Sequence, residues 1–223
     1  MSDNFSVPTI GSFFSAVRRN HVSYVQHALE RRPKLLVATI PKHPNQGPTH
    51  VAAKLGSLDV LRLLVDNGID LLRLDSLDRI ALHYAVYGSV KAVEYLLELG
   101  SPIDARDRYG NTPLHIAVKA RRSKSVKLLL EAGALVDARE KRLNTPLMEA
   151  ALSGSVRVAK LLLRAGADIN TTDRGGITAL HCVGGRSPMM TKLLINEGAD
   201  LDAVTFQCET RMSFAEMAQL GIL

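Results

Sequence analysis

The sequence predicts an all-α fold, a solenoid of stacked antiparallel helix pairs, and three observations predict it. A short motif recurs with gaps of 33, 32, 33 and 33 residues, and its last residue is His50, His83, His115, Met148 and His181 in turn. A glycine after a leucine-rich run recurs with nearly the same period, at Gly68, Gly100, Gly133, Gly166 and Gly198. The chain is 46% hydrophobic but only 4% aromatic, so its core must be aliphatic. A fixed period of this length is typical of units that bury their apolar faces against one another.

The unit around residues 111–133 shows how each repeat begins. Thr112 is a natural helix N-cap, because its hydroxyl can accept a hydrogen bond from an otherwise unpaired backbone N–H. Pro113 suits the first helical position, where its missing N–H costs nothing. Leu114 and Ala117 are then expected on the buried side of a short helix.

The second half of the same unit predicts a second helix. A turn is expected near residues 121–123, and Val126, Leu129 and Leu130 follow at the spacing of one apolar helix face. Gly133 is expected to end the helix in the left-handed conformation. An extended polar stretch then leads to Thr145, the next predicted cap.

These features together resemble the ankyrin repeat. The stretch "NTPLHIAV" carries its T-P-L-H-x-A motif, "KLLLEAGALVD" carries the leucine triplet and the G-A-x-x-(N/D) ending, and "RLNTPLMEAALSGSVRVAKLLLRAGADIN" repeats the pattern. The resemblance covers about residues 12–223. It implies an all-α ankyrin-repeat solenoid with projecting β-hairpin loops, in which the recurring histidine is a structural residue.

One domain is expected over residues 1–223. It would comprise an N-terminal partial repeat (12–32), a Pro-rich connector (33–46), five full repeats (47–76, 77–108, 109–141, 142–174 and 175–207) and a C-terminal partial repeat (208–223). The first helix of the last full repeat should be short, because Gly184, Gly185 and Pro188 disfavour a helix interior.

Composition and termini narrow the class of protein. The net charge of +6 favours acidic partners modestly, and two cysteines, Cys182 and Cys208, are too few for a secreted disulfide scaffold. The N-terminus lacks the basic and apolar regions of a signal peptide, and no apolar run approaches the length of a membrane span. We expect a monomeric cytoplasmic or nuclear protein without a membrane span.

Catalytic and cofactor motifs were sought among the histidines and glycines. Neighbouring helices pack about 8–10 Å apart, so the repeated imidazoles cannot meet on one metal ion. They should instead hydrogen-bond at the loop–helix junction, near the capping threonines. The sequence has no P-loop, G-x-G-x-x-G, G-x-S-x-G or H-E-x-x-H motif. We therefore expect no catalytic residue, no cofactor and no metal, and hence no enzyme.

Basic and apolar residues at the hairpin tips and on the first helices form the candidate partner-binding set. The set is Arg79, Arg108, Tyr109, Lys119, Arg121, Arg122, Arg139, Lys141, Arg142, Leu143, Leu152, Arg174 and Arg186. Acidic residues interrupt it at Asp107, Glu140, Glu149 and Asp173. Leu77, Tyr84 and Tyr87 are further apolar candidates, with packing between helices as the alternative for the two tyrosines.

The predicted function is a protein–protein interaction module, an adaptor, scaffold or regulatory protein, that recognises an acidic segment of another protein. Three alternatives remain. In the first, the basic residues only keep the surface soluble. In the second, they bind nucleic acid or anionic lipid, which the lack of interleaved aromatics disfavours. In the third, the chain is the targeting arm of a ubiquitin ligase or another larger complex.

A separate resemblance concerns Asn170. The stretch "LLLRAGADIN" is similar to the motif of asparagine hydroxylation in ankyrin repeats. Asn170 is therefore a candidate modification site. The alternative, which we favour, is that its side chain stabilises the hairpin.

Overall fold

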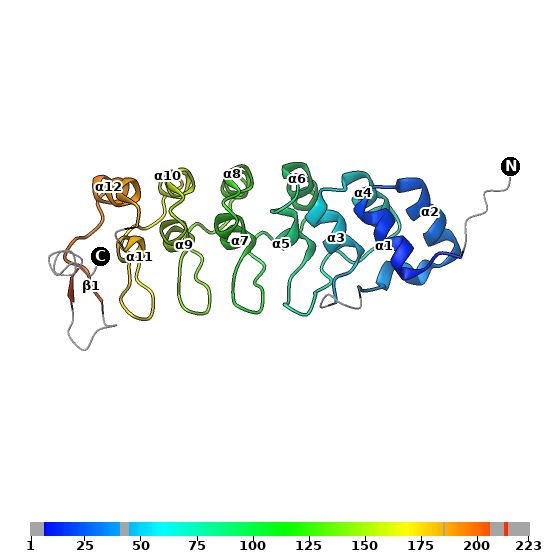
Figure 1. Cartoon of the computed structure of the whole chain (residues 1–223), viewed down its shortest axis with the longest axis horizontal. Coiled ribbons are helices and arrows are strands. Elements are labelled where there is room, and N and C mark those ends of the chain that lie inside the picture. The colour runs from blue at the N-terminus through cyan, green and yellow to red at the C-terminus, as the bar shows by residue number, and fades with distance from the viewer. Residues whose placement is uncertain (1–6, 41–44, 185, 206–211, 214–223) are drawn as a thin grey trace. The chain divides into compact units, whose positions relative to one another are not determined.

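The computed structural model describes residues 7–40, 45–184, 186–205 and 212–213 (Figure 1). The chain divides into two compact units, residues 1–108 and 109–223. Most of the predicted C-terminal partial repeat, together with Cys208, lies outside the described residues.

The described residues of the first unit form three helix pairs and one short 3-10 helix. In chain order these are α1 (Ile10–Arg18), α2 (Val22–Arg31), the 3-10 helix η1 (Pro33–Val37), α3 (Pro48–Leu55), α4 (Leu58–Asp66), α5 (Ala81–Ala85) and α6 (Val90–Glu98). The 3-10 helix occupies the first residues of the predicted Pro-rich connector.

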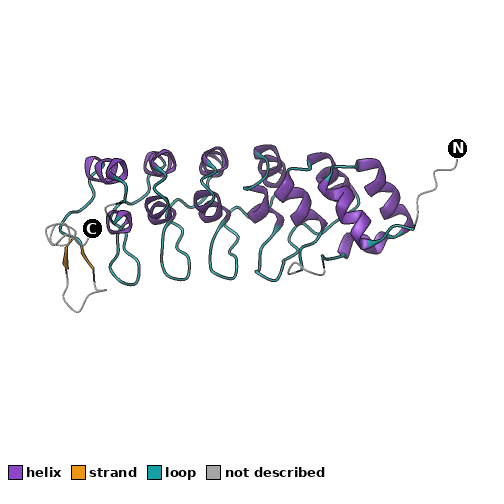
Figure 2. Ribbon diagram, in the orientation of Figure 1, coloured by secondary structure: helices purple, strands orange, loops and turns teal. Residues whose placement is uncertain are grey.

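The second unit repeats the same pattern. Its helices are α7 (Pro113–Lys119), α8 (Ser123–Glu131), α9 (Pro146–Leu152), α10 (Val156–Arg164), α11 (Ala179–Val183) and α12 (Pro188–Asn196). Two short strands, β1 (Val204–Thr205) and β2 (Met212–Ser213), pair antiparallel. Within this unit α7, α9 and α11 form one row, α8, α10 and α12 form a second, and the hairpin loops project from the first row (Figure 2). This arrangement confirms the predicted repeat fold.

The predicted helix ends are confirmed. Thr112 and Thr145 are N-caps whose side chains accept hydrogen bonds from the backbone N–H three residues later, and a proline follows each. Gly133 has a φ of 88°, the left-handed value that a glycine adopts without the steric penalty of a Cβ.

The core lies between the two rows of helices. Leu114, Ala117, Val126 and Leu129 are fully buried, as predicted. Leu130 was expected on the same stripe but is half-buried. It lies in a groove between α8 and α10, beside Leu161.

Two first helices are short, but only one was predicted. α11 spans five residues and ends at Gly184, whose φ is 51°, as the glycine-rich sequence predicted. α5 also spans five residues. Its end is fixed by Gly88, where a Cβ would lie 2.5 Å from the carbonyl oxygen of Lys54. The chain therefore turns early, because its backbone packs directly on the end of α3.

Among the described residues, none of the helices combines the length and apolar character that crossing a bilayer requires.

Candidate binding surface

Three hairpins are each built around an acidic side chain that turns inward. Glu140 Oε1 accepts hydrogen bonds from the backbone N–H of Arg142 at 2.8 Å and of Asn144 at 3.1 Å. Asp75 and Asp173 make the equivalent pair of bonds in their own hairpins. The carboxylate thereby satisfies backbone donors that the tight turn would leave unpaired.

These acidic residues do not interrupt the basic surface in the way the sequence suggested. Asp107 and Glu140 are 4% and 8% exposed, so their charges lie beneath the hairpin rather than on it. The signal was present in the sequence: Asp75, Asp107, Glu140 and Asp173 follow one another at 32 or 33 residues. A carboxylate that recurs with the period of the repeat is expected to stabilise the hairpin.

The repeated histidines link each helix start to the next hairpin. Nδ1 of His115 accepts a hydrogen bond from the backbone N–H of Thr112 at 3.2 Å, and its Nε2 lies 3.2 Å from the carbonyl oxygen of Asn144. Nε2 of His50 similarly lies 2.9 Å from the carbonyl oxygen of Arg79. Burial lowers the pKa of His50, which favours the neutral ring that this arrangement needs. The predicted hydrogen bonding of these rings at the loop–helix junction is confirmed.

The structure places Arg79 within the hairpins of the first unit rather than on a free surface. Its Nε and Nη2 donate to Asp107 Oδ2 at 3.1 and 2.8 Å, and its side chain is 19% exposed against 0% for Asp107. Burial opposes the charge, but the hydrogen bond and charge of Asp107 raise the pKa of Arg79 overall. Arg108 lies 3.7 Å from Asp78 in a more exposed pair. We therefore remove Arg79 from the candidate surface.

The apolar candidates of the first unit are buried or half-buried within it. Tyr84 is 4% exposed, and its hydroxyl donates to Asp75 Oδ2 at 2.5 Å and accepts from Gln46 at 2.8 Å. Burial, together with the bond to Asp75, raises the pKa of Tyr84 to about 12. Tyr87 and Leu77 are half-buried. The packing alternative is therefore correct for Tyr84.

Lys119 lies on the first-helix row of the second unit, where its charge is compensated. Its Nζ donates to Asn111 Oδ1 at 2.9 Å and lies 3.1 Å from Glu149 Oε1 on the neighbouring helix α9. Glu149 therefore does neutralise one predicted binding residue, although across two repeats rather than within one hairpin.

Two arginines of the second unit reach into the following repeat. The guanidinium of Arg121 donates to the carbonyl oxygen of Ser153, and that of Arg139 donates to the carbonyl oxygen of Thr172. Both side chains remain exposed, so they stabilise the contact between repeats while keeping their charge at the surface.

A third group of predicted residues is exposed and carries uncompensated charge. Lys141, Arg142 and Arg174 are exposed and make no ion pair with any residue that the structure describes. Tyr109 is 53% exposed, and its carbonyl oxygen accepts from the backbone N–H of Lys141 at 3.0 Å, which places the two side by side. We call Tyr109, Lys141, Arg142 and Arg174 the basic tip surface.

Three further predicted residues lie away from the tips, near the ends of the first helices. Arg122 precedes α8, Leu152 ends α9 and is 45% exposed, and Arg186 lies between α11 and α12. They are exposed, but the structure does not bring them together with the basic tip surface.

Within the described part of the second unit, two non-glycine residues adopt left-handed backbone conformations that the sequence did not predict. Leu143 has a φ of 68°, where the equivalent hairpin positions hold Gly110 and Gly176. Arg121 has a φ of 53°, where the next repeat has Gly154. A side chain in this conformation costs roughly 1–2 kcal/mol. Leu143 is half-buried at its hairpin tip, next to Arg142 of the basic tip surface.

Asn170 occupies a structural position between hairpins. Its Oδ1 accepts from the backbone N–H of Asp200 at 2.8 Å, and Asp137, one repeat earlier, accepts from the backbone N–H of Asp168 in the same way. The hairpin-stabilising role is therefore visible in the structure. Hydroxylation of Asn170 stays a prediction.

The protonation of Cys182 and the spacing of possible metal ligands bear on whether the chain carries a reactive site. Burial raises the pKa of the Cys182 thiol to about 12, which disfavours the reactive thiolate. Within the described ranges, His, Cys, Asp and Glu side chains do not gather in a group of three or more that could hold a metal ion.

Comparison with known proteins agrees with this architecture. The family model of ankyrin repeats (3 copies) matches residues 13–107, 74–140, 99–173 and 147–215. The chain is 45% identical over 64 residues to the putative ankyrin repeat protein L271 of Acanthamoeba polyphaga mimivirus, 28% of this chain and 9% of that protein. It is 38% identical over 151 residues to an L-asparaginase of Dirofilaria immitis, 67% of this chain and 26% of that protein.

A third relative is serine/threonine-protein kinase 12 of Arabidopsis thaliana, 39% identical over 67 residues, 30% of this chain and 15% of that protein. The chain thus spans about a quarter or less of the length of these relatives. The repeat model, in contrast, matches segments that together run from residue 13 to residue 215. The chain therefore belongs to the ankyrin repeat family, whose typically non-catalytic repeats are protein–protein interaction modules.

Proposed function

We propose that this protein is a non-catalytic binding module that recognises an acidic segment of a partner protein through the basic tip surface. The supporting observation is the opposite orientation of acidic and basic side chains in one hairpin. Glu140 turns inward to bind backbone N–H groups, whereas Lys141 and Arg142 point into solvent without an ion-pair partner among the described residues. The tips therefore present net positive charge to a ligand.

Tyr109 adds an apolar anchor to this charge. Tyrosine and arginine are enriched among the residues that dominate binding energy at protein interfaces. Lys141 is tied to Tyr109 through the backbone, and the tip of Arg174 is tied to the preceding hairpin through the bond from Arg139 to Thr172. These hairpins are fixed to one another before binding. Little conformational entropy is therefore lost in ordering them when a partner binds.

The proposal is tested with two variants that remove equal charge from different faces. The tip variant carries Lys141→Ala, Arg142→Ala and Arg174→Ala. The control carries Arg157→Ala, Lys160→Ala and Arg164→Ala, which removes three exposed basic residues from α10 in the other helix row. Each exposed substitution should change stability by no more than about 0.5 kcal/mol, so both variants should fold.

Binding is measured by quantitative affinity capture, followed by titration of each captured protein and of a ten-residue polyglutamate peptide. Partners that are kept by the wild type and the control but lost by the tip variant support the proposal. Tyr109→Ala should weaken the same partners. Equal losses in both triple variants would show that net charge alone drives binding.

The same proteins are titrated with duplex DNA and with phosphatidylserine vesicles at two salt concentrations. Nucleic-acid binding through neutralised phosphates falls steeply as salt rises. Tight, salt-sensitive DNA or vesicle binding that the tip variant abolishes, without any acidic protein partner, would replace the proposed function with the corresponding alternative.

A further inference from the structure

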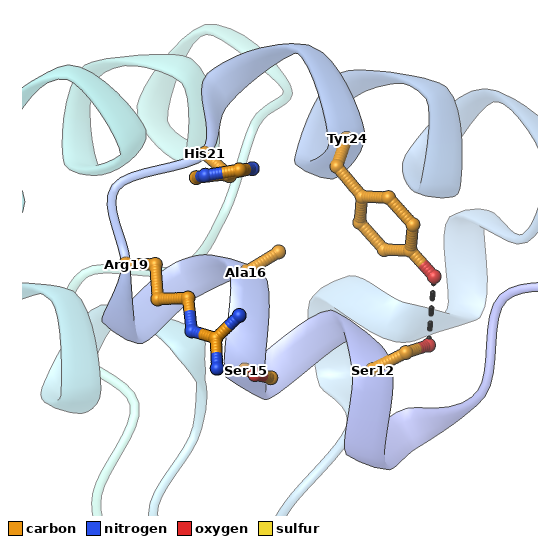
Figure 3. A pocket seen from close by; sticks show the side chains of 6 residues that line it. All are labelled: Ser12, Ser15, Ala16, Arg19, His21 and Tyr24. Atoms are coloured by element: carbon orange, nitrogen blue, oxygen red, sulfur yellow. Dashed lines mark hydrogen bonds between the residues drawn. The ribbon is translucent and has the colours of Figure 1, made fainter.

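A second candidate site lies at the first helix pair, independent of the basic tip surface. A hollow of about 190 Å³ opens between α1 and the start of α2. Its lining residues are Ser12, Ser15, Ala16, Arg19, His21 and Tyr24. In Figure 3 the lining residues of α1 are faced by His21 and Tyr24 from the start of α2.

One side of the hollow is held in place by hydrogen bonds. The Tyr24 hydroxyl donates to Ser12 Oγ at 2.8 Å, and the Ser12 hydroxyl donates in turn to the carbonyl oxygen of Thr9 at 3.1 Å. Thr9 is the N-cap of α1 and also accepts from the backbone N–H of Ser12. This wall therefore connects the two helices and is positioned before any ligand arrives.

The other side carries donors that the protein does not use. The Ser15 hydroxyl, the Arg19 guanidinium and the His21 imidazole make no hydrogen bond or ion pair with the residues that the structure describes. Arg19 is the C-cap of α1, and its backbone N–H donates to the carbonyl oxygen of Ser15 at 3.1 Å, so the two residues lie one helical turn apart on the same side of α1. His21 is the N-cap of α2, but its side chain does not cap that helix.

None of the six lining residues is acidic, so no carboxylate of the lining neutralises Arg19 or occupies the donors. Side chains of three chemical kinds, from α1, its C-cap and the N-cap of α2, line a space of about 190 Å³. This space is too small for a nucleotide base with its sugar but large enough for one tetrahedral anion with a short stem. Guanidinium groups bind phosphate through several parallel N–H bonds, which suits the three free oxygens of a monoester.

We propose that this hollow binds a phosphate monoester group, with Arg19 and His21 contacting its oxygens and Ser15 donating a further hydrogen bond. The group could belong to a phosphorylated side chain of a partner or to free phosphate. The chemistry of recognition is the same for both, and the experiment separates the two sources.

The test follows backbone amide NMR shifts of the full chain during titration with inorganic phosphate and with a phosphoserine tripeptide, alongside the unphosphorylated tripeptide. Arg19→Gln should weaken phosphate binding about tenfold, since hydrogen bonds between charged groups are among the strongest in proteins. Arg18→Gln is the matched control, because Arg18 is the exposed neighbouring arginine and does not line the hollow. It should change the affinity less than about twofold.

A third variant, Ser15→Glu, places a carboxylate four residues before Arg19. It should block phosphate binding while keeping or raising the melting temperature, because the new side chain can pair with Arg19. This variant separates a lost site from a misfolded protein. Tighter binding of the phosphoserine peptide than of inorganic phosphate identifies an attached phosphate as the ligand, whereas equal affinities identify free phosphate.

Three outcomes would overturn the proposal. They are equal weakening by Arg19→Gln and Arg18→Gln, shifts that fail to saturate by about 50 mM phosphate, and equal binding of the phosphorylated and unphosphorylated peptides. Because none of these variants touches the basic tip surface, the result is independent of the proposed protein-binding function.

Discussion

Equivalent hairpins in the two units use their basic residues differently. In the first unit Arg79 lies four residues after the inward-turned Asp75. Its guanidinium donates two hydrogen bonds to Asp107 of the next hairpin. In the second unit the position four residues after Glu140 holds Asn144, and the basic residues Lys141 and Arg142 lie at the tip instead.

The difference shows that the position of a basic residue along the hairpin decides its role. It either pairs with a carboxylate of the next repeat or remains exposed and available to a partner. The residue at the end of a hairpin faces the next repeat, where a buried carboxylate can reach it. The residues at the tip face solvent. A count of basic residues per repeat therefore overstates the available charge in the first unit and gives it more accurately in the second.

The largest effect expected from this comparison is at Arg79. Arg79→Ala leaves the carboxylate of Asp107 buried without its cation, which should lower the free energy of unfolding by about 3 kcal/mol. Arg142→Ala removes an exposed arginine that pairs with no carboxylate among the described residues, so it should change the free energy of unfolding by no more than about 0.5 kcal/mol. Urea denaturation of the two variants measures both values. Equal losses would mean that the tip arginine is as structural as Arg79.

An intermediate effect on stability is expected at the left-handed position of the hairpins, which is a glycine at Gly110 and a leucine at Leu143. At Gly110 an added Cβ would lie 3.0 Å from the backbone nitrogen of Lys141, so Gly110→Ala should destabilise by about 2 kcal/mol. Leu143→Gly, at the equivalent position, should stabilise by about 1 kcal/mol because it removes the left-handed strain.

Thermal unfolding of both variants provides the measurement. If Leu143→Gly instead destabilises the protein, then the half-buried leucine side chain contributes more packing than its backbone costs. A stabilised Leu143→Gly variant that also binds partners less well would indicate that Leu143 contributes to the basic tip surface.

The smallest effect concerns a property that the two units share. Burial lowers the pKa of His50 in the first unit and of His181 in the second. Both rings are therefore neutral in the fold, whereas the unfolded chain protonates below about pH 6.5. Their contribution to stability is present above that pH and is lost as the pH falls toward the lowered folded-state pKa values.

The melting temperature should accordingly fall as the pH decreases from about 7.5 to about 5.5. His50→Gln should melt at a lower temperature at the higher pH, because the bond to the carbonyl oxygen of Arg79 is altered, but its melting temperature should depend less on pH. An unchanged pH dependence in that variant would contradict a role for His50 in this transition.

Local features of the repeat were predictable because they depend on neighbours in the sequence. The Thr112 cap, the left-handed Gly133 and the short helix before Gly184 each follow from the chemistry of one or two residues. The early end of α5 was not predictable in this way. It depends on the close approach of Gly88 to Lys54, a contact between two repeats.

The residues of the candidate sites likewise fall into those that the sequence predicted and those that it did not. Sequence identified Tyr109 and the exposed basic residues of the tips, because hairpin tips in a periodic pattern can be located by counting. It did not distinguish Arg142 from Arg79, because both are arginines of hairpin loops and the pairing of Arg79 with Asp107 of the next hairpin is a contact through space. Nor did it suggest the hollow at Ser15, Arg19 and His21, whose residues lie on two helices and carry no repeat motif.

The sequence by itself determined the repeat, the helix ends marked by capping residues and the family, because period and capping chemistry are local and recur along the chain. The tertiary structure decided which charges are available. Whether a carboxylate such as Asp107 or Glu140 faces solvent or backbone N–H groups depends on the three-dimensional path of the hairpin and on the repeat beside it. Whether one charge neutralises another depends on the distance between them in the folded chain. The order of residues in the sequence does not give that distance.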